Sequence, residues 1–343
     1  MFAGMYWFAR LGFLGVDLFF VLSGFIISYN YWQRFSVFSY NTYRSFLWVR
    51  LARIYPVHFF TLIVSALLLI GVRVSGFVGT KDFSTWTAGN FLANAVLIHA
   101  WRLHYIDSWN NASWSVSCEW FAYLVFPLLV LIGLKKLSVP IALMCSVLFP
   151  AIPTVSAQAA YTPPYILLIK VLCEFTAGCL VYHVYTCRCE YPRVGRKLNY
   201  GVVVALTSVL VLVWEYRRLA PDWLVLIFPF VILAVAESSG FFGRLVGSKT
   251  AVYWGRVSYS LYMTHNVTLW LLKAVLPVHP GGVGMLLFLV YIASISVVAA
   301  LTYHFVEEPA RKWMRARSHG AAELVSSAKL CEDVSAASTF PNR

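Results

Sequence analysis

Two carboxylic acids lie in apolar stretches where a charge is costly. Asp17 lies in LGVDLFFVLSGFIIS, residues 14–28, and Glu119 lies in SWSVSCEWFAYLVFPLL, residues 113–129. An ionised carboxylate in such a run must be hydrated, paired with a cation, or used in chemistry. The plain interpretation is hydration at the end of a span for Asp17 and a structural ion pair for Glu119. The functional interpretation is acid–base chemistry or substrate binding.

Two arginines precede a third apolar run. Arg50 and Arg53 lie in FLWVRLARIYPVHFF, residues 46–60, and their spacing of three places them on one face of a helix. Pro56 is expected to bend or open that helix near the membrane surface. The pair either anchors the helix at the surface or clamps the phosphates of a ligand, for which guanidinium groups offer forked donors.

One histidine lies within a polar and aromatic run. His265 occurs in RVSYSLYMTHNVTLW, with Tyr259, Ser260 and Tyr262 at helical spacing. Histidine is suited to general-base chemistry near neutral pH, although a hydrogen-bonded packing group is the alternative. The other histidines lack the spacing of metal ligands, such as HExxH, so the sequence predicts no metal site.

The composition places these residues in a membrane protein. Of 343 residues, 60% are hydrophobic and 12% are charged, against about 25% charged in a soluble domain. The formal net charge of +13 comes from Lys and Arg scattered through short loops, with no basic face that would bind nucleic acid. We therefore predict an all-α, polytopic membrane protein.

A membrane span needs about 20 mainly apolar residues. The stretch 88–100 is too short and polar to cross and is expected to form an interfacial or re-entrant helix. Nine segments are expected to span: 12–32, 54–72, 114–134, 138–155, 166–186, 200–215, 221–237, 257–276 and 284–305.

Basic residues set the expected orientation, because cytoplasmic loops are enriched in Lys and Arg. Most of the basic residues fall on one side if the loop 33–53 is cytoplasmic. Nine spans then give a short extracytoplasmic tail over 1–11, a transmembrane domain over 12–317 and a cytoplasmic C-terminus. Residues 318–343 are small, polar and aperiodic, as in a disordered tail.

Five motifs occur in the order and approximate spacing of one family. They are LGVDLFFVLSGFII, RLARIYP, SWSVSCEWFAYLVFPLL, SYSLYMTH and TYHFVEEPARKW, and they cover residues 10–315 approximately. In this the chain resembles the acyltransferase-3 family, whose core typically has ten spans. The resemblance implies a bacterial membrane O-acyltransferase. Such enzymes transfer acetyl or other short acyl groups from cytoplasmic acyl-CoA to hydroxyls of surface polysaccharides, lipopolysaccharide, peptidoglycan or glycolipids.

The resemblance also implies roles for the residues described above. Arg50 and Arg53 match the RxxR motif linked to acyl-CoA, so acyl-CoA is the expected donor substrate. Asp17 matches the acid of the GVDxFF motif, Glu119 the acid of WSxxxE, and His265 the histidine of SYSxYxxH.

One family feature has no match in this sequence. Family members usually carry a further first helix, whose Arg and His are considered essential. Only MFAGMYWFARLGF precedes the GVD motif here, without a histidine. The resemblance assigns the base to that histidine and makes Asp17 its partner, with Glu119 as the alternative base or an acceptor-binding group. His265 is then a second base or supports the acyl path, and Ser23 and Cys118 are candidate acyl carriers.

Three functions remain open at this stage. The first is an O-acyltransferase of the bacterial inner membrane that acts on a glycan or lipid-linked saccharide. The second is a shortened, non-catalytic relative, which follows if the first helix is absent. The third is a transporter or flippase of lipid-linked sugars, for which repeated halves with broken helices would be expected. An alkali-labile ester on cell glycans separates the first from the other two.

Overall fold

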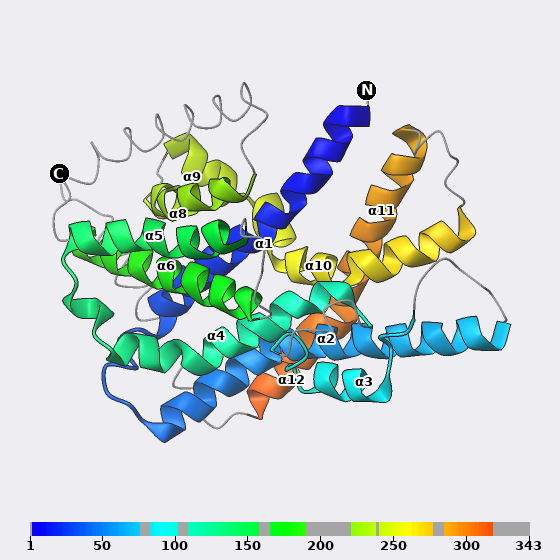
Figure 1. The fold of residues 1–343 in the computed structure, drawn as a ribbon, viewed down its shortest axis with the longest axis horizontal. Helices are drawn as coiled ribbons and strands as arrows, with labels where there is room; N and C mark the ends of the chain where they lie inside the picture. The colour runs from blue at the N-terminus through cyan, green and yellow to red at the C-terminus, as the bar shows by residue number, and fades with distance from the viewer. Residues whose placement is uncertain are drawn as a thin grey trace. The chain divides into compact units, whose positions relative to one another are not determined.

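The fold is helical, and a computed structural model describes residues 2–75, 83–101, 109–157, 165–189, 221–237, 240–276 and 285–317. Every regular element among these residues is a helix or helical turn (Figure 1). The α-helices are α1 (Phe2–Tyr31), α2 (Tyr40–Ser75), α3 (Ala88–Ala95), α4 (Trp114–Leu131), α5 (Val139–Ala157), α6 (Ile166–Cys189), α8 (Phe228–Ala236), α9 (Gly240–Val246), α10 (Lys249–Val275), α11 (Met285–Thr302) and α12 (Glu308–Ala316). Shorter turns are η1 (Asn111–Ser113), η2 (Leu134–Lys136), η3 (Pro221–Ile227) and η4 (Tyr303–Glu307).

Several of these helices can cross a membrane. The described residues contain five helices that are long and apolar enough, and two shorter apolar helices, Val139–Pro153 and Leu224–Ala236. The five are Gly12–Tyr31, Tyr40–Ser75, Asn111–Leu131, Ile166–Cys187 and Leu286–Ala316. The chain is thus a multi-pass membrane protein.

The predicted count of nine spans is not confirmed. The segment 257–276 lies in α10, which carries more polar residues and is not one of the five. The expected span 200–215 and the expected tail 318–343 lie outside the described residues.

Two boundaries differ from the sequence expectation. Helix α2 begins at Tyr40, so most of the expected loop 33–53 is helical, and the helix continues without a break through Pro56. Proline removes one backbone hydrogen bond from a helix, yet the segment around Pro56 stays helical. Helix α1 begins at Phe2, so the backbone of the expected N-terminal tail is helical from that residue on.

The chain forms two compact units. The first unit comprises residues 1–38, 101–103 and 121–247, and the second comprises 39–100, 104–120 and 248–343. Helix α4 is divided between them, so that its first residues, through Trp120, belong to the second unit.

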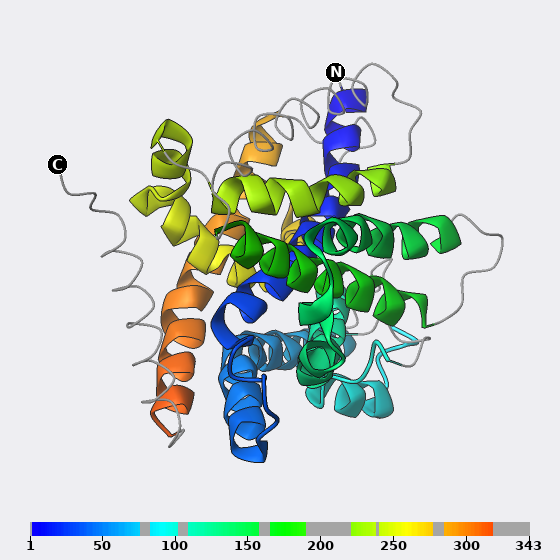
Figure 2. The same ribbon diagram turned by 90° about the vertical axis from the view of Figure 1, so that its left-hand side faces the viewer.

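The first unit is built around the packing of α6 against α1 and α5, which Figure 2 shows from a second direction. Two glycines allow the backbones of α1 and α6 to touch. A Cβ atom added at Gly24 would lie 2.0 Å from the carbonyl oxygen of Phe175, and one at Gly178 would lie 1.9 Å from that of Val21. Gly24 is therefore at the closest approach of the two helices, whereas Gly15 on the same helix has nothing within 4 Å among the described residues.

The second unit packs α10 against α11 and α2, and α2 also contacts α3 and α12. Part of its hydrophobic core is a buried cluster of Leu62, Leu69, Trp86 and Trp109. Helix α3 is only eight residues long, and the Thr87 hydroxyl caps it by accepting a hydrogen bond from the Asn90 amide at 3.2 Å. The prediction of a short, non-spanning helix within 88–100 is thus confirmed.

Candidate active site

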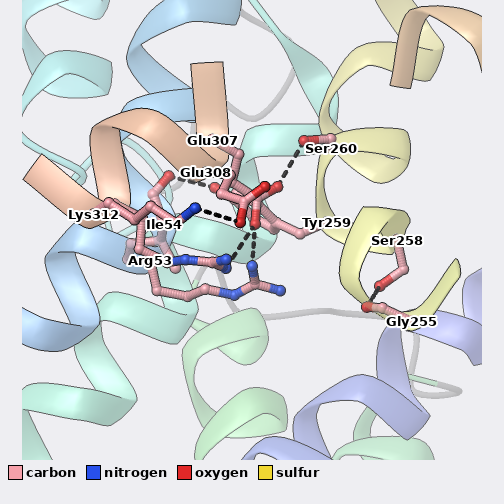
Figure 3. Close-up of polar contacts among 10 residues, drawn as sticks. Arg53, Ile54, Gly255, Ser258, Tyr259, Ser260, Glu307, Glu308 and Lys312 are labelled. Atoms are coloured by element: carbon pink, nitrogen blue, oxygen red, sulfur yellow. Dashed lines mark hydrogen bonds and ion pairs between the residues drawn. The ribbon is translucent and has the colours of Figure 1, made fainter. Parts of the chain in front are cut away.

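The second unit brings Arg53 to a buried carboxylate. Arg53 of α2 forms an ion pair with Glu307, which is completely buried, and Figure 3 shows both side chains pointing toward α10. Ser260 donates a 2.7 Å hydrogen bond to the other carboxylate oxygen of Glu307. The Tyr259 hydroxyl donates to the carbonyl of Ile54 at 2.5 Å, and the Arg53 guanidinium lies 5.5 Å from the Tyr259 ring centre. Three helices that are far apart in sequence are therefore joined at one charge pair.

Glu307 owes its position to an irregular turn. Residues Tyr303–Glu307 form the π-helical turn η4 between α11 and α12. A π turn holds more residues than an α turn, and such turns occur often at functional sites. Arg311, one turn further on in α12, lies 3.4 Å from the same Glu307 oxygen that pairs with Arg53. The turn thus places one carboxylate between two arginines.

A hydrogen-bonded pair in the second unit joins the helices that carry Glu119 and His265. Ser115 lies four residues before Glu119 on α4, so both project from one helix face. The Ser115 hydroxyl donates to the Tyr262 hydroxyl of α10 at 2.9 Å, and the charge of buried Glu119 acts on that same tyrosine. His265 Nδ1 lies 2.5 Å from the Tyr262 carbonyl oxygen.

This contact determines which ring nitrogen of His265 can accept a proton. A carbonyl oxygen only accepts hydrogen bonds, so Nδ1 carries the hydrogen in the neutral ring. Nε2 of His265 then keeps its lone pair, as a general base requires. The side chain is partly buried.

A buried polar network holds the start of α4. The Ser113 hydroxyl donates to the Asn110 carbonyl at 2.6 Å and lies 3.1 Å from His99 Nε2. Asn94 of α3 contacts the same hydroxyl, and its carbonyl oxygen lies 2.8 Å from His58 Nε2. Burial, followed by the neighbouring His58, lowers the pKa of His99 to about 3, so His99 is neutral at ordinary pH. The network therefore positions the helix that carries Glu119.

The first unit contains Asp17. Asp17 is buried in α1, and one of its carboxylate oxygens lies 2.8 Å from Lys170 Nζ of α6. Lys170 Nζ is also 3.9 Å from Glu174, one helical turn away on α6. The carboxylate that the sequence singled out is thus one member of an acid–lysine–acid group.

The remaining candidate residues differ in how deeply they are buried. Arg53 shares α2 with Arg50, which lies three residues earlier and is partly buried. Of the candidate acyl carriers, Ser23 lies in α1 and is nearly buried, and Cys118 lies in α4 and is fully buried.

Glu307, Lys170 and Glu174 were not among the candidates predicted from the sequence. Each had a signal: Glu307 is an acid at the end of an apolar run, and Lys170 and Glu174 are four residues apart in an expected span. Among the residues that the structure describes, no group of three or more His, Cys, Asp or Glu side chains could hold a metal ion.

Fold and site together define a helical multi-pass membrane protein with paired acids, arginines and a histidine on its apolar helices. The chain belongs to the acyltransferase-3 family: the model of that family, described as an acyltransferase domain, matches residues 1–304. The resemblance found in the sequence is confirmed. No solved structure matches the chain.

Two relatives show the family's range. The chain is 23% identical over 336 residues to the peptidoglycan O-acetyltransferase OatA of Listeria monocytogenes, covering 89% of this chain and 52% of that protein. It is 31% identical over 120 residues to the acyltransferase MdmB of Streptomyces mycarofaciens, covering 34% of this chain and 28% of that protein. The chain thus spans about half the length of the first relative and less of the second.

Proposed function

We propose that this protein is a membrane O-acyltransferase that moves an acetyl or other short acyl group from acyl-CoA to a hydroxyl of a glycan. One observation carries the proposal: the Ser115–Tyr262 hydrogen bond joins the Glu119 face of α4 to the His265 turn of α10. The two helices that carry the candidate bases Glu119 and His265 are thereby bonded to each other, in a chain of an acyltransferase family. The protein acts in the bacterial inner membrane with its C-terminus in the cytoplasm.

The proposed chemistry is ester formation from a thioester. The acceptor oxygen forms a bond to the acyl carbon, the carbon–sulfur bond breaks, and the hydroxyl proton ends on the sulfur of the released thiol. A base is needed as the hydroxyl attacks, and Glu119 or His265 Nε2 takes that proton. Arg50 and Arg53 bind phosphates of the donor, because guanidinium groups match phosphate oxygens. Asp17 as the companion of a base stays a prediction.

Peptidoglycan is the first acceptor to test, because one relative is named for O-acetylating it. The Glu119→Gln variant is expected to lose at least nine-tenths of the base-labile acetate on the cell wall of an expressing strain. Gln keeps the shape of Glu but cannot take a proton or carry the charge, so the amount of protein in the membrane should stay unchanged. The measurement is acetate released by mild alkali from purified peptidoglycan, normalised to membrane protein.

A matched control is Glu308→Gln, which removes a carboxylate paired only with surface Lys312 in its own helix turn and should leave the ester level unchanged. The donor is tested separately with purified protein, where wild type but not Glu119→Gln should release free thiol from acetyl-CoA when acceptor is present. Wild-type ester in the Glu119→Gln strain would remove Glu119 from the site. Absence of ester with the wild-type chain on peptidoglycan and on exported polysaccharide alike would overturn the proposed activity.

A further inference from the structure

The acid–lysine–acid group of the first unit has one carboxyl without a hydrogen bond. Glu174 is completely buried, and neither of its carboxyl oxygens has a hydrogen-bond partner. Lys170 Nζ lies 2.8 Å from Asp17 but 3.9 Å from Glu174, beyond hydrogen-bonding distance. The lysine is therefore committed to Asp17, and Glu174 lies beside an ion pair that is already formed.

Charge balance decides the state of this carboxyl. Among these three groups one ammonium neutralises one carboxylate, so ionised Glu174 would give the group a net negative charge at a buried position. Burying an uncompensated carboxylate costs far more than binding a proton, and such a group neutralises instead. The negative charge of Asp17 nearby acts in the same direction.

The described residues around Glu174 offer it no cation besides Lys170. The turn η2 carries two lysines, but it meets α6 near His183, nine residues beyond Glu174. On its own helix the neighbouring ionisable groups are Lys170 and Cys173, and from α1 it is faced by Asp17. Within the described residues, α8 carries no ionisable side chain, and α5 carries only Cys145. The aromatic rings of Tyr123 and Phe126 from α4 pack on the adjacent Phe175.

We propose that Asp17, Lys170 and Glu174 form a proton-binding site inside the membrane, in which Asp17 and Lys170 are the ion pair and Glu174 holds the proton. The ligand of the site is thus a single exchangeable proton. The carboxyl can pass that proton to Asp17 only if Lys170 changes partner, so the lysine controls the exchange. This inference does not rest on the proposed acyltransferase activity.

Infrared spectroscopy of the purified full-length protein at pH 7 tests the site. The difference spectrum of wild type minus Glu174→Gln should contain the carbonyl band of one protonated carboxyl. Gln matches the protonated form in shape and charge, so this variant should keep the wild-type melting temperature. A difference spectrum that contains only carboxylate bands, from a variant that folds normally, would overturn the proposal.

Two further variants test the control by Lys170. In Asp17→Asn the ammonium loses its carboxylate and should turn to Glu174, which then ionises, so the Glu174 band should disappear. In Lys170→Met the ion pair is lost and Glu174 gains no cation, so the Glu174 band should persist. An unchanged band in Asp17→Asn would contradict the assigned ion pair, even if Glu174 itself is protonated.

A lipid-soluble carbodiimide gives a second, residue-specific readout, because it reacts with protonated carboxyls in apolar surroundings. Peptide mass spectrometry should find Glu174 modified in wild type and unmodified in Asp17→Asn. Glu307 is the internal control: it is equally buried, but Arg53, Arg311 and Ser260 all contact its carboxyl oxygens, so it should stay unmodified. Modification of Glu307 with Glu174 untouched would reverse the assignment.

Discussion

At the scale of single residues, Arg53 has one observed partner, Glu307, and one proposed partner, the donor phosphates. The sequence analysis assigned it to donor phosphates, and the structure pairs it with Glu307. These roles are compatible, because the guanidinium has five donors and its side chain is 24% exposed while Glu307 is not exposed at all. Substitution of Arg53 therefore removes a structural ion pair as well as a candidate ligand contact, and abundance alone cannot be assumed constant.

The Arg53→Ala variant is expected to lose both stability and ester formation. The stability loss should be about 2 kcal/mol, less than the roughly 3–5 kcal/mol of a fully buried pair, because Arg53 is partly exposed and Arg311 still faces Glu307. Arg53→Ala with Glu307→Gln removes both charges, so the double variant should regain most of the lost stability. Thermal unfolding in detergent measures this. Ester formation should stay absent in the double variant.

The contrast between the two readouts separates the roles of Arg53. If the double variant regains ester together with stability, Arg53 acts only as the partner of Glu307. Regained stability without ester places Arg53 in donor binding.

Polar residues in apolar runs could be identified as site candidates from the sequence, but the residues that they contact could not. Asp17, Arg53, Glu119 and His265 could be singled out because each is polar where the sequence is apolar. Arg53 and its partner Glu307 are 254 residues apart, and no local spacing connects them. Only the packing of α2 against η4 and α10 brings that carboxylate to the arginine.

At the scale of elements, helix positions followed from hydropathy, whereas interruptions did not. The apolar runs at 114–134 and 166–186 became α4 and α6 with nearly the expected bounds. Pro56 was expected to bend or open its helix, and α2 stays helical through it, so the helix does not open there. Local propensity sets where a helix is favoured, and packing decides where it stops.

The contact between α1 and α6 predicts opposite effects for two glycines. Gly24→Ala places a methyl group against the Phe175 carbonyl, which cannot retreat without moving the α6 backbone. We expect a loss of about 1–3 kcal/mol or more, as for other overpacked contacts, measured as a lower melting temperature. Gly178→Ala should behave alike because of its contact with Val21.

Gly15→Ala is the matched control on the same helix. Nothing lies within 4 Å of the added methyl group, and Ala favours a helix over Gly by about 1 kcal/mol. This variant should be as stable as wild type or more stable. Equal losses at Gly15 and Gly24 would show that the close contact between the two helices does not exist in the membrane.

At the scale of the whole molecule, the orientation in the membrane can be tested directly. The basic loops predict that residues 33–39 and the C-terminus lie in the cytoplasm. A fluorescent protein fused after Arg343 should therefore fluoresce, and alkaline phosphatase at the same place should be inactive.

The phosphatase fused after Ser75 should be active, because α2 crosses the membrane once between residues 33–39 and Ser75. Activity of the phosphatase after Arg343 would reverse the orientation. It would also remove the argument that Arg50 and Arg53 face a cytoplasmic donor.

The π-helical turn Tyr303–Glu307 gives the C-terminal helices a place where one residue can be lost. Phe305 lies in this turn and is 75% exposed. A π turn holds one residue more than the α turn that would replace it, so deleting Phe305 should restore a regular helix and leave α12 in nearly the same rotation relative to α11. Glu307 and Arg311 would then stay beside α2. Deleting one residue inside α11 would instead rotate everything beyond it by about 100° and carry both side chains away from α2.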